Sequence, residues 1–542
     1  MKKILFALGL LVSTLSAEAA DTLFVRQPQV PILLERHDNV LLQLRMEATE
    51  SQTLEEITLA FQESLPLHTV KAVKLYYAGT DARQDRSLHR FAPVNYLSSH
   101  TPGATRSANR SYSICKAEVR PTTSTVTLTG NQKLFPGVNF FWVSIEMDET
   151  AGLDTKVTAN ITSATADGQS VPVRTLSDPQ IVRRMGVGVR HAGDDGAAAF
   201  RIPGLVTTNQ GTLLGVYDIR YNSSVDLQER IDIGLSRGTD GGRTWEKMRI
   251  PLSFGEYGGL PAAQNGVGDP SILVDTRTNT AYIVAAWTHG MGNQRAWWSS
   301  FPGMDPDRTA QLVLAKSTDD GQTWSAPVNI TRQVKKPGWF FLLQGPGRGI
   351  TTSDGTLVFP IQYIDENRIP NAGIMYSRDG GTTWTIHNHA RSNTTEAQVA
   401  EVEPGVLMLN MRDNRGGSRA VYTTTDLGKT WKEHESSRTA LIEPVCMASL
   451  ISVKASDNVL GKDLLIFSNP HSTEHRRNLT IQISLDGGYT WLPEHRLLLD
   501  EEESWGYSCL TMIDREHLGI LYESSVAHMT FQSIPLKDIV KE

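Results

Sequence analysis

The chain has 542 residues, which is too long for one ordinary domain. Its net charge of −7 argues against a general binder of the phosphate backbone, so we expect no nucleic-acid partner. The three cysteines, Cys115, Cys446 and Cys509, give neither a disulfide framework nor the spacing of a metal site, and we expect buried free thiols.

Residues 1–20 have the pattern of a secretory signal peptide. Lys2 and Lys3 supply the positive start, residues 4–15 the apolar run, and the small residues up to Ala20 a cleavage site. No later stretch is apolar for the roughly 20 residues that a membrane helix needs. We therefore expect an exported protein, periplasmic or secreted, with no integral membrane segment.

Residues 21–180 are predicted to form a separate β-sandwich domain. Runs typical of strands, such as residues 139–145, alternate with clusters of Ser, Thr, Gly and Pro, and no long helical period is present. No catalytic constellation stands out in this stretch. Tyr76, Tyr77 and Trp142 are candidates for a sugar-binding platform, although core packing explains the same residues.

A polar, turn-rich stretch, residues 167–179, leads into a repeat-bearing half. One eight-residue unit, Ser-x-Asp-x-Gly-x-Thr-Trp in its fullest form, recurs there at 238–245, 317–324, 377–384, 424–431 and 484–491. Each copy suits a hairpin turn, because the Asp can accept bonds from downstream amides and the Gly suits a positive φ.

The residues around these units predict strands. Apolar residues at every second position precede most copies, as at Ile231, Ile233 and Leu235. Repeats at irregular gaps of tens of residues fit four-stranded blades arranged around an axis. A short helix is expected near residues 536–540, and the rest of this half reads as β.

Three arginines lie close to apolar strand residues rather than in a charge run: Arg201, Arg412 and Arg476. If strand ends bring them together, they would hold a carboxylate strongly, since guanidinium groups pair with it bidentately and stay charged. Each one alone is equally explained by a surface salt bridge. The sequence pattern does not show that they converge.

One tyrosine and two carboxylates are further candidates. Tyr507 lies among small residues just before an apolar strand, while Glu396 and Asp226 lie in polar stretches beside predicted strands. A tyrosine in the core or at a rim, and solvated loop carboxylates, are the alternative explanations.

The order of Phe200-Arg-Ile-Pro203 followed by five Asp-box repeats resembles the bacterial exo-α-sialidases (neuraminidases) over about residues 185–535. The whole chain is similar to the secreted sialidases of Bacteroides-type gut bacteria. This resemblance implies an all-β fold, with a six-bladed β-propeller catalytic domain (residues 181–542) preceded by the β-sandwich domain. It also implies that the boxes lie at blade hairpins far from the active site. Gly238, in place of Ser in the first box, weakens a turn and leaves the chemistry unaffected.

The resemblance also assigns roles to individual residues. It makes Tyr507 the nucleophile, Glu396 its base partner and Asp226 the acid/base. The substrate-binding positions that it implies are the arginine triad Arg201, Arg412 and Arg476, with Arg220 and Asp269 as further pocket residues. Arg476 is preferred to Arg477 because it precedes the following strand by the family spacing. An apolar pocket for the N-acetyl group is expected, with unspecific candidates Trp287, Met291, Trp297 and Trp298.

The chemistry of sialic acid explains these residue types. Its anomeric carbon carries a carboxylate, which would repel a carboxylate nucleophile, whereas a tyrosine hydroxyl attacks as a neutral group. A free tyrosine has a pKa near ~10, so a base must take its proton. No metal or organic cofactor is required, and the expected partners are sialylated glycans.

Three functions remain open at this point. The first is a retaining exo-α-sialidase that hydrolyses terminal sialic acid from glycoproteins, glycolipids and oligosaccharides. The second is a trans-sialidase or an intramolecular, anhydro-forming sialidase with the same site. The third is a non-catalytic, glycan-binding propeller, which need not keep all six candidate residues together. We expect a monomer, and the sequence does not give the linkage preference.

Overall fold

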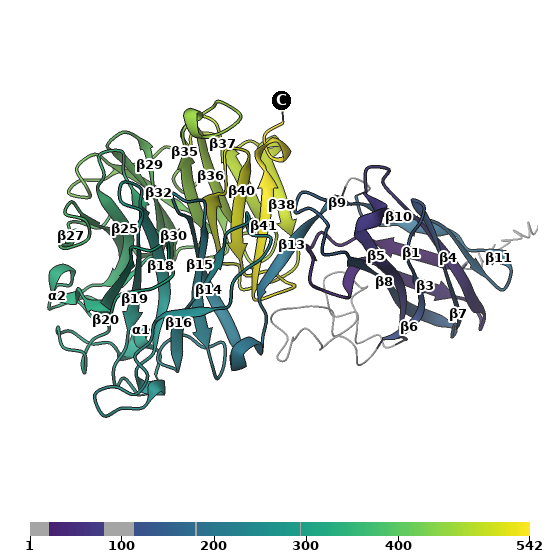
Figure 1. The fold of residues 1–542 in the computed structure, drawn as a ribbon, viewed down its shortest axis with the longest axis horizontal. Coiled ribbons are helices and arrows are strands. Elements are labelled where there is room, and N and C mark those ends of the chain that lie inside the picture. The colour runs from purple at the N-terminus through teal and green to yellow at the C-terminus, as the bar shows by residue number, and fades with distance from the viewer. Residues whose placement is uncertain (1–20, 81–112, 179–180, 293, 542) are drawn as a thin grey trace, which may run out of the picture.

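The computed structural model describes residues 21–80, 113–178, 181–292 and 294–541, and strands dominate it (Figure 1). The predicted signal peptide lies outside these residues. Among them, no helix is both long and apolar enough to cross a membrane. The α-helices that they contain are single short turns, α1 (Ala296–Ser299) and α2 (Thr331–Val334). The helix expected near residue 536 is a 3₁₀ turn, Leu536–Asp538.

Two sheets that share one hydrophobic core make up the N-terminal part of the chain (Figure 1). The first has the order β12 (Val173–Thr175), β1 (Thr22–Arg26), β3 (Asn39–Ala48), β8 (Gly137–Met147), β5 (Val70–Gly79) and β6 (Ile114–Val119). The second has the order β11 (Gln169–Ser170), β10 (Ala159–Ala166), β4 (Thr53–Phe61) and β7 (Thr125–Lys133). Alternate residues of β4 and β7 are buried, as expected for a sheet with one face on a core.

The structure bears on two expectations for this part, the exposure of its aromatic residues and the burial of Cys115. Tyr76 stacks on the buried Trp142 with ring centroids 4.3 Å apart, so this pair packs within the fold. The prediction of three buried thiols is wrong for Cys115, which is exposed, whereas Cys446 and Cys509 are buried. The reason is that Cys115 lies on β6, an edge strand whose residues are largely exposed.

Six larger sheets and one two-stranded sheet follow in the C-terminal part of the described chain. The first sheet contains β14 (Ala199–Thr207), β15 (Leu213–Arg220), β16 (Ile231–Gly238) and β17 (Arg249–Leu252). The second contains β18 (Val267–Asp275), β19 (Thr280–Trp287), β20 (Gln311–Ser317), β21 (Val328–Asn329) and β23 (Gly347–Arg348). The third contains β22 (Phe341–Gln344), β25 (Leu357–Ile364), β26 (Pro370–Ser377) and β27 (Thr385–Ile386), with β24 (Ile350–Thr351) and β28 (Arg391–Ser392) paired at its side.

The remaining sheets complete the series. The fourth sheet contains β29 (Thr394–Glu403), β30 (Val406–Asp413), β32 (Ala420–Thr424) and β33 (Lys432–Glu433). The fifth contains β35 (Ser449–Val453), β36 (Leu464–Pro470), β37 (Leu479–Ser484) and β38 (Arg496–Asp500). The sixth contains β39 (Ser508–Met512), β40 (His517–Tyr522), β41 (Met529–Pro535) and β13 (Arg183–Arg190), with β2 (Ile32–Leu33) and β9 (Lys156–Val157) paired to β13. A two-stranded sheet pairs β31 (Gly417–Ser418) with β34 (Ile442–Glu443).

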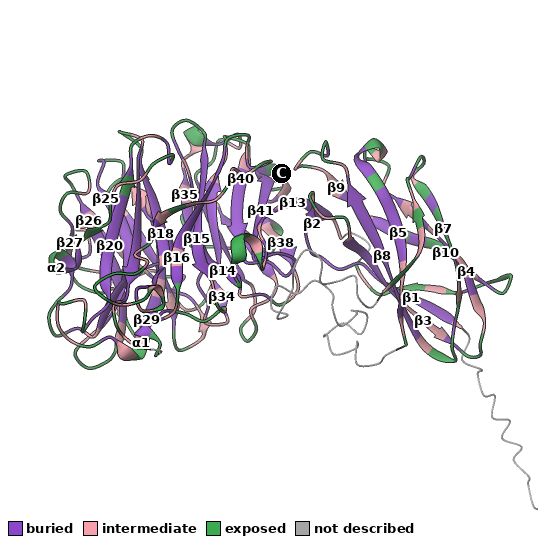
Figure 2. Cartoon of the chain, turned by 60° about the horizontal axis from the view of Figure 1, so that its bottom comes forward, coloured by how far each residue is buried: buried purple, intermediate pink, exposed green. Residues whose placement is uncertain are grey.

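Five hydrophobic cores of this part each lie between two successive sheets. A further core joins the last sheet to the first, because Leu521 and Phe531 pack with Leu213 and Tyr217. In addition, β13 pairs antiparallel with β41, so the start and the end of this part share one sheet. Buried residues accordingly fill the strands, and exposed residues gather in the loops (Figure 2).

The predicted Asp-box turns are confirmed. In residues 484–491, Thr490 donates from its amide nitrogen and hydroxyl to Asp486 at 2.9 and 2.7 Å, and Ser484 donates to Asp486 at 2.7 Å. The Trp491 indole donates to the carbonyl of Gly488, whose φ is 95°. Each box joins the third and fourth strands of its sheet. The first box has no serine hydroxyl at position 238 but keeps its Thr-to-Asp bonds.

Candidate active site

One cavity of about 660 Å³ collects most of the predicted site residues. Those that line it are Arg201, Asp226, Asp269, Glu396, Arg412, Arg476 and Tyr507. They come from seven different loops or strands, and the first and the last of them, Arg201 and Tyr507, are 306 positions apart in the sequence. Arg477 is not among the lining residues. The strands β14, β18 and β29 each contribute to this cavity near one end.

Tyr507, which directly precedes β39, is at the centre of a hydrogen-bonded cluster. Its hydroxyl donates to Glu396 Oε1 and accepts a bond of 3.2 Å from Arg412 Nη1. The same Arg412 nitrogen donates to Glu396 Oε2 at 2.7 Å. Burial, and next the Glu396 carboxylate, raise the pKa of Tyr507 well above its usual value. The phenol is therefore neutral in the ligand-free site and already faces a carboxylate that can accept its proton.

A fully buried carboxylate, Glu523, holds two sides of this cluster together. Arg201 Nε donates to Glu523 at 2.8 Å, and the amide nitrogens of Ile202 and Tyr507 each donate at 3.0 Å. Burial alone raises the pKa of Glu523, but Arg201 and the two amides outweigh it and the pKa is lowered. Glu523 thus stays ionised and neutralises Arg201 from behind.

The backbone next to Arg201 is strained. Ile202 has a φ of 62°, which a β-branched residue rarely adopts. The bond from its amide to Glu523 holds this conformation, and Ile202 packs with Tyr507 in a small buried cluster. Sequence reasoning did not identify Glu523. The available signal was a carboxylate directly after the apolar strand 518–522.

Arg220 lies behind the cavity instead of lining it, and this corrects the expectation of a pocket residue. Its side chain is 1% exposed and donates to Asp218 at 2.9 Å and to Asp226 at 2.7 Å. Asp218 also accepts the amide of Asp269 at 2.8 Å, at a residue whose φ is 58°. Arg220 therefore acts on the cavity through Asp226, and Asp218 fixes both Arg220 and the Asp269 backbone.

The pKa values of the two aspartates at the cavity shift in opposite directions. Burial raises the pKa of Asp226, but Arg220 and Arg201 lower it more, and the net shift is downward. Burial and the neighbouring Asp218 and Asp226 raise the pKa of Asp269. Because the Asp226 side chain is 54% exposed, it is accessible from the cavity mouth. Without a ligand, Asp226 is ionised.

Three guanidinium groups converge around the tyrosine ring. Arg201 and Arg476 lie over it with centroid distances of 5.4 and 5.6 Å, and Arg412 bonds its hydroxyl. Arg476 is oriented by the carbonyls of Trp505 and Val445 at 3.1 and 3.2 Å. The cavity is lined by five arginines, Arg201, Arg295, Arg368, Arg412 and Arg476, and by three carboxylates, Asp226, Asp269 and Glu396, so it carries an excess of positive charge suited to an anion.

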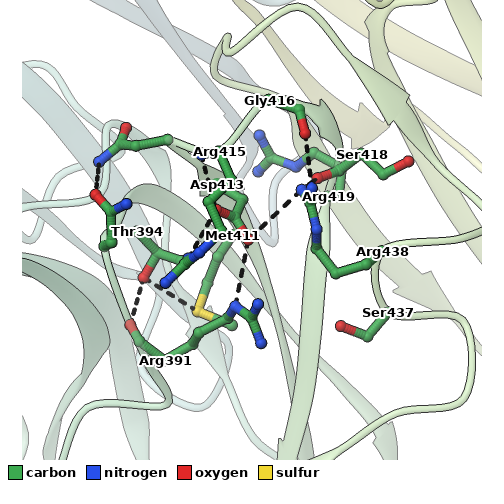
Figure 3. A network of polar contacts seen from close by, with 12 residues as sticks. Arg391, Thr394, Met411, Asp413, Arg415, Gly416, Ser418, Arg419, Ser437 and Arg438 are labelled. Atoms are coloured by element: carbon green, nitrogen blue, oxygen red, sulfur yellow. Dashed lines mark hydrogen bonds and ion pairs between the residues drawn. The ribbon is translucent and has the colours of Figure 1, made fainter.

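A polar network behind Arg412 secures the ends of β29 and β30 (Figure 3). Its centre is the fully buried Asp413, which pairs with Arg415 at 2.9 Å, Arg391 at 3.3 Å and Arg438 at 3.5 Å. The strands that Asp413 anchors carry Glu396 and Arg412 into the cavity. Sequence analysis did not single out this network.

The apolar wall of the cavity includes two of the four residues that were named as candidates for an N-acetyl pocket. Trp297 and Trp298 line the cavity together with Phe341, Leu343 and Leu227. Trp287 is instead buried and stacked on a neighbouring phenylalanine, with ring centroids 4.2 Å apart. Met291 is likewise not among the lining residues.

Comparisons with known proteins show which family this chain resembles. Residues 20–170 match the family model of the N-terminal domain of BNR-repeat neuraminidase, and residues 202–523 match that of the BNR repeat-like domain. A sialidase of Bacteroides fragilis is 71% identical over 97% of this chain and 96% of its own length. A sialidase of Clostridium perfringens is 32% identical over 60% of this chain and 86% of its own length. The solved structure of the Hadza microbial sialidase Hz136, 60% identical, matches 95% of this chain and 100% of its own with a TM-score of 0.92.

Proposed function

The chain belongs to the BNR-repeat neuraminidases, the sialidases, and on that premise we propose how its cavity performs catalysis. The protein is an exo-α-sialidase, a glycoside hydrolase that removes terminal sialic acid. We propose that it retains the anomeric configuration through an intermediate bound covalently to Tyr507. The observation that carries this proposal is the Tyr507 hydroxyl, bonded to both Glu396 and Arg412 at the floor of a cationic cavity.

Substrate binding follows from the charge of the cavity. The sialic acid carboxylate would lie among Arg201, Arg412 and Arg476, whose forked donors suit a carboxylate and whose charge does not depend on pH. This places the adjacent anomeric carbon above the Tyr507 hydroxyl, which the same guanidinium groups surround. Trp297 and Trp298 offer an apolar surface for the N-acetyl group.

The first chemical step forms the intermediate. Tyr507 Oη attacks the anomeric carbon while its proton passes to Glu396, and the bond to the glycosidic oxygen breaks. Asp226 gives a proton to that departing oxygen. In the second step Asp226 takes a proton from water, the water oxygen attacks the anomeric carbon, and Tyr507 leaves and recovers its proton from Glu396. Two inversions give net retention.

Asp226 must be protonated for the first step, although its pKa is lowered in the ligand-free site. Binding of the substrate raises this pKa. When its carboxylate pairs with Arg201, which lies 4.0 Å from Asp226, the positive field at Asp226 falls and its pKa rises. Asp226 therefore takes up a proton as the substrate binds.

We also propose the architecture that presents this cavity. The six C-terminal sheets would be the blades of a six-bladed β-propeller, residues 181–542, and residues 21–180 would form a β-sandwich domain. Shared cores between successive sheets, and the core that returns from the last sheet to the first, support the ring. We propose export to the periplasm or beyond, on the basis of residues 1–20.

Proton NMR of sialyllactose hydrolysis tests the proposed function. We expect the α-anomer of free sialic acid to appear first and then to convert to the β-anomer in solution. Early β-anomer would contradict a retaining mechanism. An anhydro product or a sialylated acceptor would instead assign the same site to intramolecular or intermolecular transfer.

A further inference from the structure

The segment 501–507 connects β38 to β39 and supports two site residues at once. Its last residue is Tyr507. The Ser504 amide donates to the carbonyl of Arg476 at 2.9 Å, and Arg476 donates back to the carbonyl of Trp505 at 3.1 Å. The position of this segment therefore sets the position of both the tyrosine and one arginine of the triad.

The opposite end of the segment is bound to the N-terminal part of the chain. Arg26, at the end of β1, donates to Glu501 and, at 3.2 Å, to Glu502. The amide of Gln29 donates to the Glu501 carboxylate at 2.9 Å, and the Glu501 amide donates to the Gln29 carbonyl at 2.8 Å. Gln43 accepts a further bond from Arg26 at 2.6 Å, which fixes the guanidinium within the N-terminal sheet.

The same N-terminal stretch reaches a second support of the site. Arg36 donates to the carbonyl of Val526 at 2.6 Å, and Val30 and Leu33 pack against Val526 and Ala527 in a small buried core. This turn follows Glu523, the carboxylate that holds Arg201 and the Tyr507 amide.

The two contacts are also connected within the C-terminal part. Ser525 donates from its amide to Asp500 at 2.7 Å and from its hydroxyl at 2.9 Å, and Asp500 directly precedes the segment. Residues 26–36 thus contact both the segment 501–507, which ends at Tyr507, and the turn after Glu523, whose carboxylate binds the Tyr507 amide.

The energetics favour a positioning role for Arg26. Its side chain is 9% exposed, whereas those of Glu501 and Glu502 are 20% and 23% exposed. Loss of the cation would leave two carboxylates that water can reach, so the segment could move toward solvent without unfolding the sheets. Displacement of a reacting group by ~1 Å can cost ~100-fold in rate.

We propose that Arg26, acting through Glu501 and Glu502, is a positioning residue for the nucleophile segment, and that the N-terminal part of the chain is thereby a working part of the catalytic site. This inference rests on the proposed role of Tyr507. It assigns to the N-terminal part a task that requires no glycan binding of its own.

The test uses the full mature chain with Arg26→Gln, Glu501→Gln and the double variant. The matched control is Lys156→Gln, which removes another ion pair between the two parts, Lys156 to Asp538 at 2.7 Å, that involves no residue of the segment. We expect kcat on an aryl sialoside to fall about tenfold in each single variant, with little change in the control. The double variant should lose no more than the single ones, because the two residues act as one unit.

Melting temperatures separate positioning from stability. All three single variants should lose a similar amount of thermal stability, while only the Arg26 and Glu501 variants lose kcat. Equal kcat in Arg26→Gln and Lys156→Gln, or additive losses in the double variant, would overturn the inference. Full activity in Tyr507→Phe would instead overturn the proposed function, so the two failures are distinguishable.

Discussion

The Asp boxes and the catalytic cavity use the same device on different scales. In each, a carboxylate accepts several hydrogen bonds and fixes a backbone. Asp486 accepts bonds from Ser484 and Thr490, within one exposed turn. Glu523 accepts bonds from Arg201, which is 322 positions away, and from the Tyr507 amide, within a buried site. The repeated and conspicuous carboxylates shape turns, whereas those placed next to the chemistry occur once each and lie far apart in the chain.

Carboxylates that shape turns and carboxylates that support catalysis therefore leave different traces in a sequence. A local turn closes its bonds within a few residues, so repetition makes it visible. A catalytic carboxylate is recognised only by its partner residues, which are distant in the sequence and meet it in the folded protein.

Two tyrosines provide the sharpest contrast. Tyr507→Phe should lower kcat on sialyllactose by at least ~10³-fold, because the nucleophilic oxygen is lost. Tyr489→Phe alters an Asp-box tyrosine that is 55% exposed, and turnover should not change. Steady-state kinetics of both variants, with circular dichroism to check the fold, would decide this. Near-normal turnover by Tyr507→Phe would remove the distinction.

Replacement of the buried carboxylate should reduce both stability and activity. Glu523→Gln leaves Arg201 buried without its counter-charge, and we expect a loss of about 3 kcal/mol in the free energy of unfolding. Activity should fall about 100-fold, because Arg201 and the Tyr507 amide lose their common anchor. Glu516→Gln, which changes an exposed carboxylate in the preceding turn, is the matched control.

The pH dependence of that loss has a definite sign. The pKa of Glu523 is lowered below its ordinary value of 4.5, so its stabilising effect is present above that value and is lost as the pH falls through the lower folded-state pKa. Gln does not titrate. The difference in melting temperature between the parent and Glu523→Gln should therefore shrink on acidification below pH ~4. A difference that is constant from neutral to acidic pH would contradict this assignment.

The acid role of Asp226 predicts a dependence on the leaving group. Asp226→Asn should lower kcat/KM on natural glycans by about 100-fold, and much less on aryl sialosides whose leaving group needs no proton. Both substrates are measured on the same protein preparation, so each serves as the control for the other. Equal losses on the two substrates would argue that Asp226 only binds or orients the sugar.

The smallest effect is expected in a box. Asp486→Ala removes bonds from Ser484 and Thr490 and should cost about 1 kcal/mol of stability, as the loss of a helix cap does. kcat/KM should stay within about twofold of the parent, because such surface turns lie outside the site. A large catalytic loss in a variant that remains folded would show that the boxes participate in the chemistry.

Local physics predicted the turns and many of the strands. The stretch 139–145 lies within β8, and the boxes adopt the expected bonds, because both depend on neighbours in sequence. Arg201 and Tyr507 were candidates because they lie beside predicted strands, and the family resemblance gave them roles; no local pattern shows that they meet. The structure brings them to one cavity.

The missed residues share one feature. Glu523, Asp218 and Asp413 are buried carboxylates whose partners are chosen by packing between strands and sheets. The sequence shows such a residue only as a carboxylate beside an apolar run. Arg220 was predicted in the pocket but lies behind it, since two aspartates draw its side chain into the protein. The contact between Arg26 and Glu501 joins residues 475 positions apart, which no periodicity can indicate.

The most direct test of the central claim is to trap the intermediate. A sialosyl fluoride with a second fluorine at carbon 3 should lose the fluoride at carbon 2 and form the glycosyl enzyme, which then reacts slowly with water because the fluorine at carbon 3 destabilises the oxocarbenium-like transition state. Peptide mass spectrometry of the trapped enzyme should find a single sialosyl adduct on Tyr507. An adduct on Glu396, or no adduct on an enzyme that still hydrolyses sialyllactose with retention, would contradict the tyrosine mechanism.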